Sequence, residues 1–222
     1  MISKHNTAII NDIIIEQNIK NFDPRWIGRG ALYEPTRTWV MNIPKNASNS
    51  IGRLIAPGNI PRKNWLMEQR YSEVGKPTDK FIVVLRNPWE RFYGSLAQYY
   101  IIRLEHGSTL TEINQDIDNL LWMDPKFDDV HVWPQFSFLH GLPISQIKFM
   151  NLETITELPD NLGISSAMES WNVSNDNDNQ RATKMRIRAI AESNHTVKAH
   201  LDNYYRTDTD IMKNILGYLP NR

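Results

Sequence analysis

The sequence predicts an α/β fold in which helices flank a central parallel sheet. Thr38 to Ile43 and Lys80 to Leu85 are short apolar runs, partly β-branched, with the length and composition of buried strands. Ile147 to Leu152 is a third such run, and helical patterning lies between the three. Because parallel neighbours need a crossover connection, which is usually a helix, this alternation favours a parallel sheet covered by helices.

Length and composition favour one domain. A chain of 222 residues supplies one sizeable core, so we treat residues 38–222 as a single domain and residues 1–37 as an N-terminal arm of unclear role. The 25 Lys and Arg balance the 25 Asp and Glu, which removes the broad cationic field of a general nucleic-acid-binding protein. The absence of cysteine excludes disulfides and thiolate chemistry.

The beginning of the chain carries no export or membrane signal. The apolar run from Ile9 to Ile15 is short and is interrupted by Asn11 and Asp12, so it cannot span a bilayer. We therefore expect a cytoplasmic protein without a membrane partner.

Helices are expected after the first two strands. Ile51, Leu54 and Ile55 have helical spacing, and Asn87 is followed by Pro88 at the first helical position and by Glu90 where a capping-box acid would stand. Further helices are expected at 110–121, 132–140, 183–191 and from 196 to the C-terminus, and a polar loop at 172–180.

The junction from the first strand to its helix has the chemistry of an anion site. Lys45 supplies a positive charge, and a helix N-terminus offers backbone N–H groups and the positive end of the helix dipole. The spacing G-x-x-x-x-G-K-[ST] of nucleoside-triphosphate loops is absent. Arg86 ends the second strand, at the carboxyl edge where open α/β sheets bind ligands. The alternative interpretation is a capped helix preceded by a solvated lysine.

At these two segments the chain resembles the sulfotransferases that use 3′-phosphoadenosine 5′-phosphosulfate, particularly the carbohydrate sulfotransferases and their bacterial and viral relatives. Ile43-Pro-Lys-Asn-Ala-Ser48 is similar to the family's 5′-phosphosulfate loop, and Phe81-Ile-Val-Val-Leu-Arg-Asn-Pro-Trp-Glu-Arg-Phe92 to its 3′-phosphate segment. Weaker similarities follow in the family's order at 131–135, 148–153, 171–174 and 204–208, so the resemblance extends from Thr38 to the end.

The resemblance implies a P-loop-like, three-layer fold and a set of nucleotide-binding residues. These are Lys45, Asn46, Ala47, Ser48, Asn49, Ser50, Arg86 and Ser95. This chain departs from the family at one position. The family has a serine that helps to hold the 3′-phosphate, and the matching residue here is Gly94. The serine of this chain is the next residue, Ser95, which lies roughly 100° further around a helix.

Sulfuryl transfer also needs a base and a cation. Lys45 suits the charge that develops on the leaving phosphate, and His131, beside Asp128 and Asp129, is the first candidate for the base. By its residue type alone His131 is more often a capping or packed histidine; the resemblance places it in the substrate cleft. Glu68 is the second candidate, because some related enzymes use a glutamate there. This chemistry requires no metal.

Structural roles are expected for several other charged residues. Glu90 and Arg91 are expected to be ion-pair or helix-surface residues, and the same holds for a basic cluster after the polar loop, Arg181, Lys184, Arg186 and Arg188.

The predicted function is transfer of a sulfuryl group from 3′-phosphoadenosine 5′-phosphosulfate to a hydroxyl, with a carbohydrate acceptor implied by the resemblance alone. Two alternatives stay open: a nucleotide-dependent kinase with a Mg²⁺ site, and a non-catalytic nucleotide-binding protein that would tolerate loss of both candidate bases.

Overall fold

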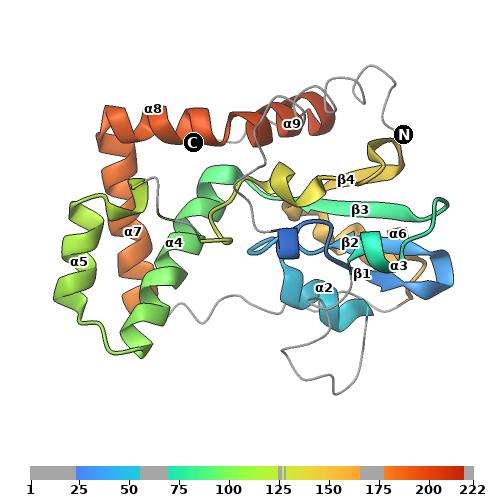
Figure 1. Ribbon diagram of the computed structural model, residues 1–222, viewed down its shortest axis with the longest axis horizontal. Coiled ribbons are helices and arrows are strands. Elements are labelled where there is room, and N and C mark those ends of the chain that lie inside the picture. The colour runs from blue at the N-terminus through green and yellow to red at the C-terminus, as the bar shows by residue number, and fades with distance from the viewer. Residues whose placement is uncertain (1–23, 56–69, 125–126, 128, 166–177, 218–222) are drawn as a thin grey trace.

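The structure, a computed structural model, describes residues 24–55, 70–124, 127, 129–165 and 178–217 (Figure 1). These residues form a mixed α/β fold, in which helices pack around a four-stranded, mostly parallel sheet. The strands are β1 (Gly30–Tyr33), β2 (Thr38–Met41), β3 (Lys80–Leu85) and β4 (Ile147–Asn151). They lie in chain order across the sheet; β1 pairs antiparallel with β2, whereas β2, β3 and β4 are mutually parallel.

The three predicted strands are confirmed, the first and the third slightly shorter than expected. The edge strand β1 was not predicted, because four residues that begin with glycine carry too weak a pattern. Gly30 pairs with Met41, and a Cβ at Gly30 would lie 2.8 Å from the carbonyl oxygen of Val40, so this close pairing needs glycine. Part of the arm to which the sequence assigned no role thus belongs to the sheet.

The helices follow the expected order with several differences; among them, the short helices at Tyr71–Val74 and Leu158–Leu162 were not expected. The α-helices are α2 (Ser48–Ile55), α3 (Tyr71–Val74), α4 (Pro88–Glu105), α5 (Leu110–Asp118), α6 (Leu158–Leu162), α7 (Asp178–Ser193), α8 (His195–Tyr204) and α9 (Arg206–Leu216). The 3-10 helices are η2 (Pro24–Trp26), η3 (Glu34–Thr36), η4 (Leu121–Met123), η5 (Gln135–Leu139), η6 (Ile144–Gln146) and η7 (Leu152–Glu157).

Several of the expected segments have other bounds in the structure. The helix expected at 132–140 is only η5, since Pro134 precedes it in an extended conformation with ψ 142°. The C-terminal helix is divided into α8 and α9 at Tyr205, whose φ and ψ of −100° and 12° are not helical. The polar loop expected to extend to residue 180 ends earlier, because α7 begins at Asp178; residues 172–177 lie outside the described part.

Alternating side chains of the strands build two cores on opposite faces of the sheet. On one face Trp39, Phe81 and Phe149 pack with η5 and with Ile211 and Met212 of α9. On the other face Val40, Ile82 and Met150 pack with apolar residues of α2 and α6. Helical segments therefore cover both faces.

A third core lies beside the sheet, among α4, α5, α7 and α8, which gather at one side of Figure 1. Its aromatic members include Phe92, Tyr100 and Tyr205. Through α4, which begins three residues after β3, this helical part meets the carboxyl ends of the parallel strands. In the described residues no helix combines the length and the apolarity needed to cross a membrane.

Candidate functional site

The turn after β2 has an unusual backbone. Asn46 N–H donates to the Ile43 carbonyl at 3.1 Å, which closes a turn with Pro44 at its second position and Lys45 at its third. Lys45 and Ala47 have φ values of 70° and 59°, in the left-handed region that residues with a side chain rarely enter. Left-handed residues interleaved with ordinary ones are the pattern of a backbone anion nest, and strain of this kind is concentrated at functional sites.

The side chain of Asn46 fixes this turn to β3. It is 2% exposed, and its Nδ2 donates to the Val84 carbonyl at 2.7 Å and to Gln135 Oε1 at 2.5 Å. The sequence predicted that Asn46 contacts phosphate; its side-chain Nδ2 and its backbone N–H instead donate to acceptors within the protein. Ala47 is half-buried and Ser50 is buried, and the side chains of Ser48 and Asn49 lie outside the described part.

Lys45 and Arg86 meet at one edge of the sheet. Arg86 Nη1 donates to the Lys45 carbonyl at 3.2 Å, and Lys45 Nζ contacts Oε1 of Gln98 on α4. The turn after β2, the end of β3 and α4 thus converge at the carboxyl ends of two adjacent parallel strands.

The start of α4 confirms one local prediction and corrects another. Asn87 Oδ1 accepts the N–H groups of Trp89 and Glu90 at 2.9 and 3.2 Å, as a helix cap does. Glu90 does not reach back to Asn87 as a capping box requires. Its carboxylate pairs with Lys184 at 3.3 Å and with Arg188, which lies over the ring of Tyr93.

Most of the basic cluster has structural partners. Beside the two contacts with Glu90, Arg186 pairs with Asp118 on α5 through Nε at 3.1 Å. These contacts join α7 to α4 and α5, so they support the interpretation of this cluster as a helix face. Arg181 is exposed.

Arg91 is fully buried behind the turn. Its Nε donates to the Pro44 carbonyl at 2.9 Å and its Nη1 to the Trp133 carbonyl at 2.5 Å. Burial lowers the pKa of Arg91, while nearby Tyr205 and Asp208 act in the opposite direction. Arg91 was expected to be an ion-pair or helix-surface residue; it is instead buried and donates to two carbonyls, and it thereby ties the turn to the segment that carries His131.

Gly94 and Ser95 occupy different environments on α4. Ser95 has no exposed surface, and its Oγ has no hydrogen-bond partner among the described residues. Gly94 is half-buried, and a Cβ built on it meets no atom of the described residues within 4 Å. Gly94 also stands one turn before Gln98, on the side of α4 that contacts Lys45. The predicted site residue Ser95 thus faces the interior, and Gly94 lies next to open space.

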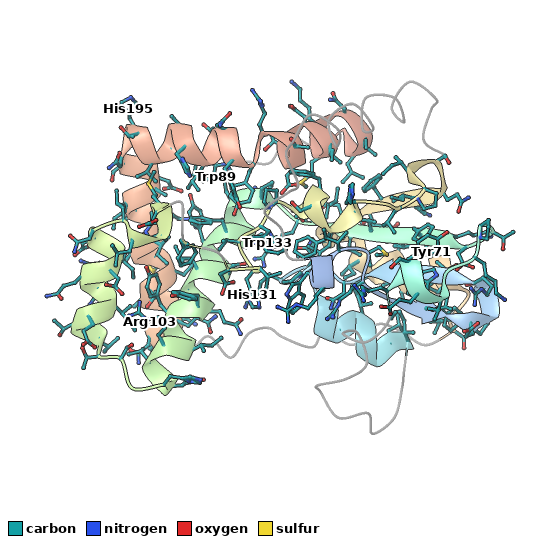
Figure 2. All side chains as sticks on the ribbon, viewed as in Figure 1. Tyr71, Trp89, Arg103, His131, Trp133 and His195 are labelled. Atoms are coloured by element: carbon teal, nitrogen blue, oxygen red, sulfur yellow. The ribbon has the colours of Figure 1, made fainter. Side chains whose placement is uncertain are left out.

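His131 is oriented by Asp129. Its Nδ1 lies 2.7 Å from Asp129 Oδ1, which also accepts the His131 N–H at 2.8 Å. Because a carboxylate only accepts, this contact assigns the Nδ1 position a proton and leaves Nε2 as the accepting nitrogen. Burial raises the pKa of Asp129, but the bonds from His131 outweigh it, and the net shift is downward. Figure 2 shows His131 and Trp133 between α4 and the sheet.

Two other predicted residues lie outside the described residues: Asp128, expected beside His131, and Glu68, the second candidate for the base. In the described segments no group of three or more histidines and carboxylates could hold a metal ion.

Two glutamines of the site were missed by sequence reasoning. Gln98 contacts Lys45, and Gln135, with no exposed surface, contacts both Asn46 and Arg86. The available signal was weak: each is a single uncharged polar residue within an apolar stretch, and such a residue is buried only when its hydrogen bonds are satisfied.

The fold and the site together define a mixed α/β protein with a basic turn at the carboxyl edge of its parallel strands. Comparison with known proteins yields no relative: no family model, no curated protein and no solved structure matches this chain.

Proposed function

We propose that this protein is a sulfotransferase that moves a sulfuryl group from 3′-phosphoadenosine 5′-phosphosulfate to a carbohydrate hydroxyl. One observation carries the proposal: the turn with Lys45 and the strand end with Arg86 meet at the carboxyl ends of adjacent parallel strands, joined by the 3.2 Å bond from Arg86 Nη1 to the Lys45 carbonyl. Ligands of open α/β sheets bind at such an edge. Helical segments on both faces of the sheet are compatible with a P-loop-like, three-layer fold.

The two cations suit the two ends of the donor nucleotide. The turn and the first residues of α2 bind the 5′-phosphosulfate through backbone N–H groups and Lys45, since the N-terminus of a helix favours an anion. Arg86, on the neighbouring strand, binds the 3′-phosphate. Two anion contacts separated by one strand spacing select a nucleotide with two phosphorylated positions.

The reaction needs one bond made, one broken and one proton moved. The acceptor oxygen attacks sulfur, and the bond between sulfur and the bridging phosphate oxygen breaks in line with it. The acceptor proton passes to Nε2 of His131, and the negative charge remains on adenosine 3′,5′-bisphosphate, where Lys45 stabilises it. Asp129 supports the positive charge that His131 gains. Glu68 remains the second candidate for the base.

Calorimetric titration tests the proposal. Wild-type protein is titrated with adenosine 3′,5′-bisphosphate and, separately, with ATP and Mg²⁺; we expect binding of the bisphosphate in preference to ATP. Lys45→Ala should weaken bisphosphate binding by about 10- to 100-fold, because charge-assisted hydrogen bonds contribute about 1.5–3 kcal/mol.

The matched control is Lys80→Ala, which removes an exposed lysine at the opposite end of β3 and should leave the affinity unchanged. Preference for ATP would favour the kinase alternative and overturn the proposal.

A further inference from the structure

The buried amide of Gln135 connects the two halves of the proposed nucleotide site. Its Oε1 accepts the N–H of Arg86 at 2.9 Å, and its Nε2 donates to the Arg86 carbonyl at 2.8 Å. A pair of opposed bonds to one residue is what a neighbouring strand would supply, so the side chain extends the hydrogen bonding of β3 beyond its last residue, Leu85.

The same oxygen also holds the turn after β2. Gln135 Oε1 accepts Nδ2 of Asn46 at 2.5 Å, and this Nδ2 donates in addition to the Val84 carbonyl at 2.7 Å. A single acceptor atom therefore sets the position of the turn proposed to bind the 5′-phosphosulfate relative to the end of β3 proposed to bind the 3′-phosphate.

Asp208 of α9 holds Gln135 in place. Its carboxylate accepts the N–H groups of Gln135 and Phe136 at 2.7 and 3.0 Å, and both Asp208 and Gln135 are buried. Buried polar networks of this kind are rigid, because a displaced member leaves unsatisfied groups in a medium of low dielectric constant.

We infer that Gln135 is a positioning residue that determines selectivity for a nucleotide with both a 5′ and a 3′ phosphate. This inference rests on the proposed function, since Gln135 is inferred to set the spacing between the two anion contacts of the proposed nucleotide site. An amide is required for this role. Glutamate at the position would keep an acceptor for Arg86 N–H but would replace the donor to the Arg86 carbonyl by an oxygen, so two acceptors would face each other.

The measurement is the ratio of dissociation constants for adenosine 5′-phosphate and adenosine 3′,5′-bisphosphate. Arg86→Ala should reduce this ratio by about tenfold or more, since it removes the charged contact to the 3′ group. Gln135→Glu should reduce the ratio by about three- to tenfold although it leaves the guanidinium of Arg86 in place. The double variant should lose no more than Arg86→Ala alone, because both changes act on the same contact.

Ser137→Ala is the matched control. Ser137 is two residues further along η5, is fully buried, and its Oγ has no partner among the described residues. Its removal should leave the ratio unchanged. Thermal melts establish that each variant is folded at the titration temperature; if Gln135→Glu is not, Gln135→Met, of similar volume, replaces it with the same expectation.

The outcomes separate the two proposals. If the wild type binds both nucleotides equally, or binds neither, the proposed function fails and this inference fails with it. If the wild type discriminates but Gln135→Glu weakens both nucleotides equally, or neither, the proposed function stands and Gln135 is merely structural.

Discussion

The two ends of the parallel strands use buried polar groups in opposite ways. At the amino end, the carboxylate of Asp79 has no exposed surface and receives four hydrogen bonds. Arg37 donates two at 2.9 Å, Trp39 Nε1 donates one at 2.8 Å, and Lys76 N–H donates one at 2.9 Å. A cation and an anion meet directly, and the acid is saturated.

At the carboxyl end, the described contacts of the cations go to uncharged oxygens. Arg86 donates to the Lys45 carbonyl, Arg91 to the Pro44 and Trp133 carbonyls, and Lys45 to the amide of Gln98. Carbonyl and amide oxygens orient a cation through hydrogen bonds and carry no net charge themselves.

This difference places residues that stabilise the fold at the amino end of the strands and residues proposed to bind a ligand at the carboxyl end. A saturated ion pair stabilises the fold and has little left to offer a ligand, whereas a turn with left-handed residues at Lys45 and Ala47 is suited to an anion. Changes to Asp79 at the amino end should therefore affect stability alone, and changes to the half-buried Lys45, Arg86 and His131 at the carboxyl end should affect binding or rate with little change in stability.

The largest effect is expected for His131→Ala. Loss of a general base lowers the rate of sulfuryl transfer by about 10² to 10⁴-fold, and the melting temperature should change little because the side chain is about one-third exposed. The rate is measured as release of adenosine 3′,5′-bisphosphate at saturating donor with a panel of carbohydrate acceptors.

His140→Ala, at an exposed histidine after η5, is the control and should have no effect. An unchanged rate in His131→Ala together with a large loss in Glu68→Gln would transfer the role of base to Glu68. A protein with no transfer activity in any form would support the non-catalytic alternative.

The second prediction concerns the amino end. Asp79→Ala leaves the donors of Arg37, Trp39 and Lys76 without their shared acceptor and should lower the free energy of unfolding by about 2–4 kcal/mol. That corresponds to a fall of about 5–15 °C in melting temperature for a domain of this size. Bisphosphate affinity below the melting temperature should stay within about twofold of the wild type.

The pH dependence of this stability has a defined sign. Burial raises the pKa of Asp79, but the bonds from Arg37, Lys76 N–H and Trp39 outweigh it and hold the pKa below the ordinary value of 3.8. The contribution is therefore complete above that value and is lost as the pH falls through the lowered pKa. The melting temperature of the wild type should drop more steeply than that of Asp79→Ala as the pH falls below about 4.

Glu34→Ala is the control for this end. Glu34 also pairs with Arg37, at 3.0 Å, but its side chain is 71% exposed, so its removal should cost less than about 0.5 kcal/mol. Equal destabilisation by the two changes would contradict the contrast between a buried and an exposed partner.

The smallest effect is expected for Gly94→Ser. The space around Gly94 admits a side chain, and serine would add a hydroxyl donor on the side of α4 that contacts Lys45. Affinity for adenosine 3′,5′-bisphosphate should rise by about three- to tenfold, as one additional hydrogen bond contributes roughly 0.5–1.5 kcal/mol.

Ser95→Ala also tests whether Gly94 or Ser95 lies at the nucleotide site. Since Ser95 Oγ is buried without a described partner, its removal should leave nucleotide affinity unchanged. Weaker binding of the 3′-phosphorylated nucleotide in Ser95→Ala would return Ser95 to the site and contradict the assignment of Gly94.

Much of the framework follows from local sequence. Lys80 to Leu85 is apolar and β-branched and is a strand; Asn87 and Pro88 begin α4; the chain turns at Pro44. The prediction that Lys45 and Arg86 share a sheet edge needed only two parallel strands whose ends they follow.

Contacts between distant segments could not be predicted in this way. Glu90 has a suitable capping position by sequence, yet pairing with Lys184 and Arg188 on α7 prevails. The burial of Ser95 depends on how α4 packs in the folded protein, and the position of Gln135 depends on Asp208, which lies 73 residues away in the chain.

The sequence alone therefore determined the three parallel strands, the start of α4 and the residues that follow β2 and β3, because hydrogen bonds and apolar periodicity within a few residues specify them. The tertiary structure decided which polar side chains turn inward to hold the site and which remain at its surface. Those choices depend on satisfying buried donors and acceptors across segments far apart in the chain, and no local pattern records such partners.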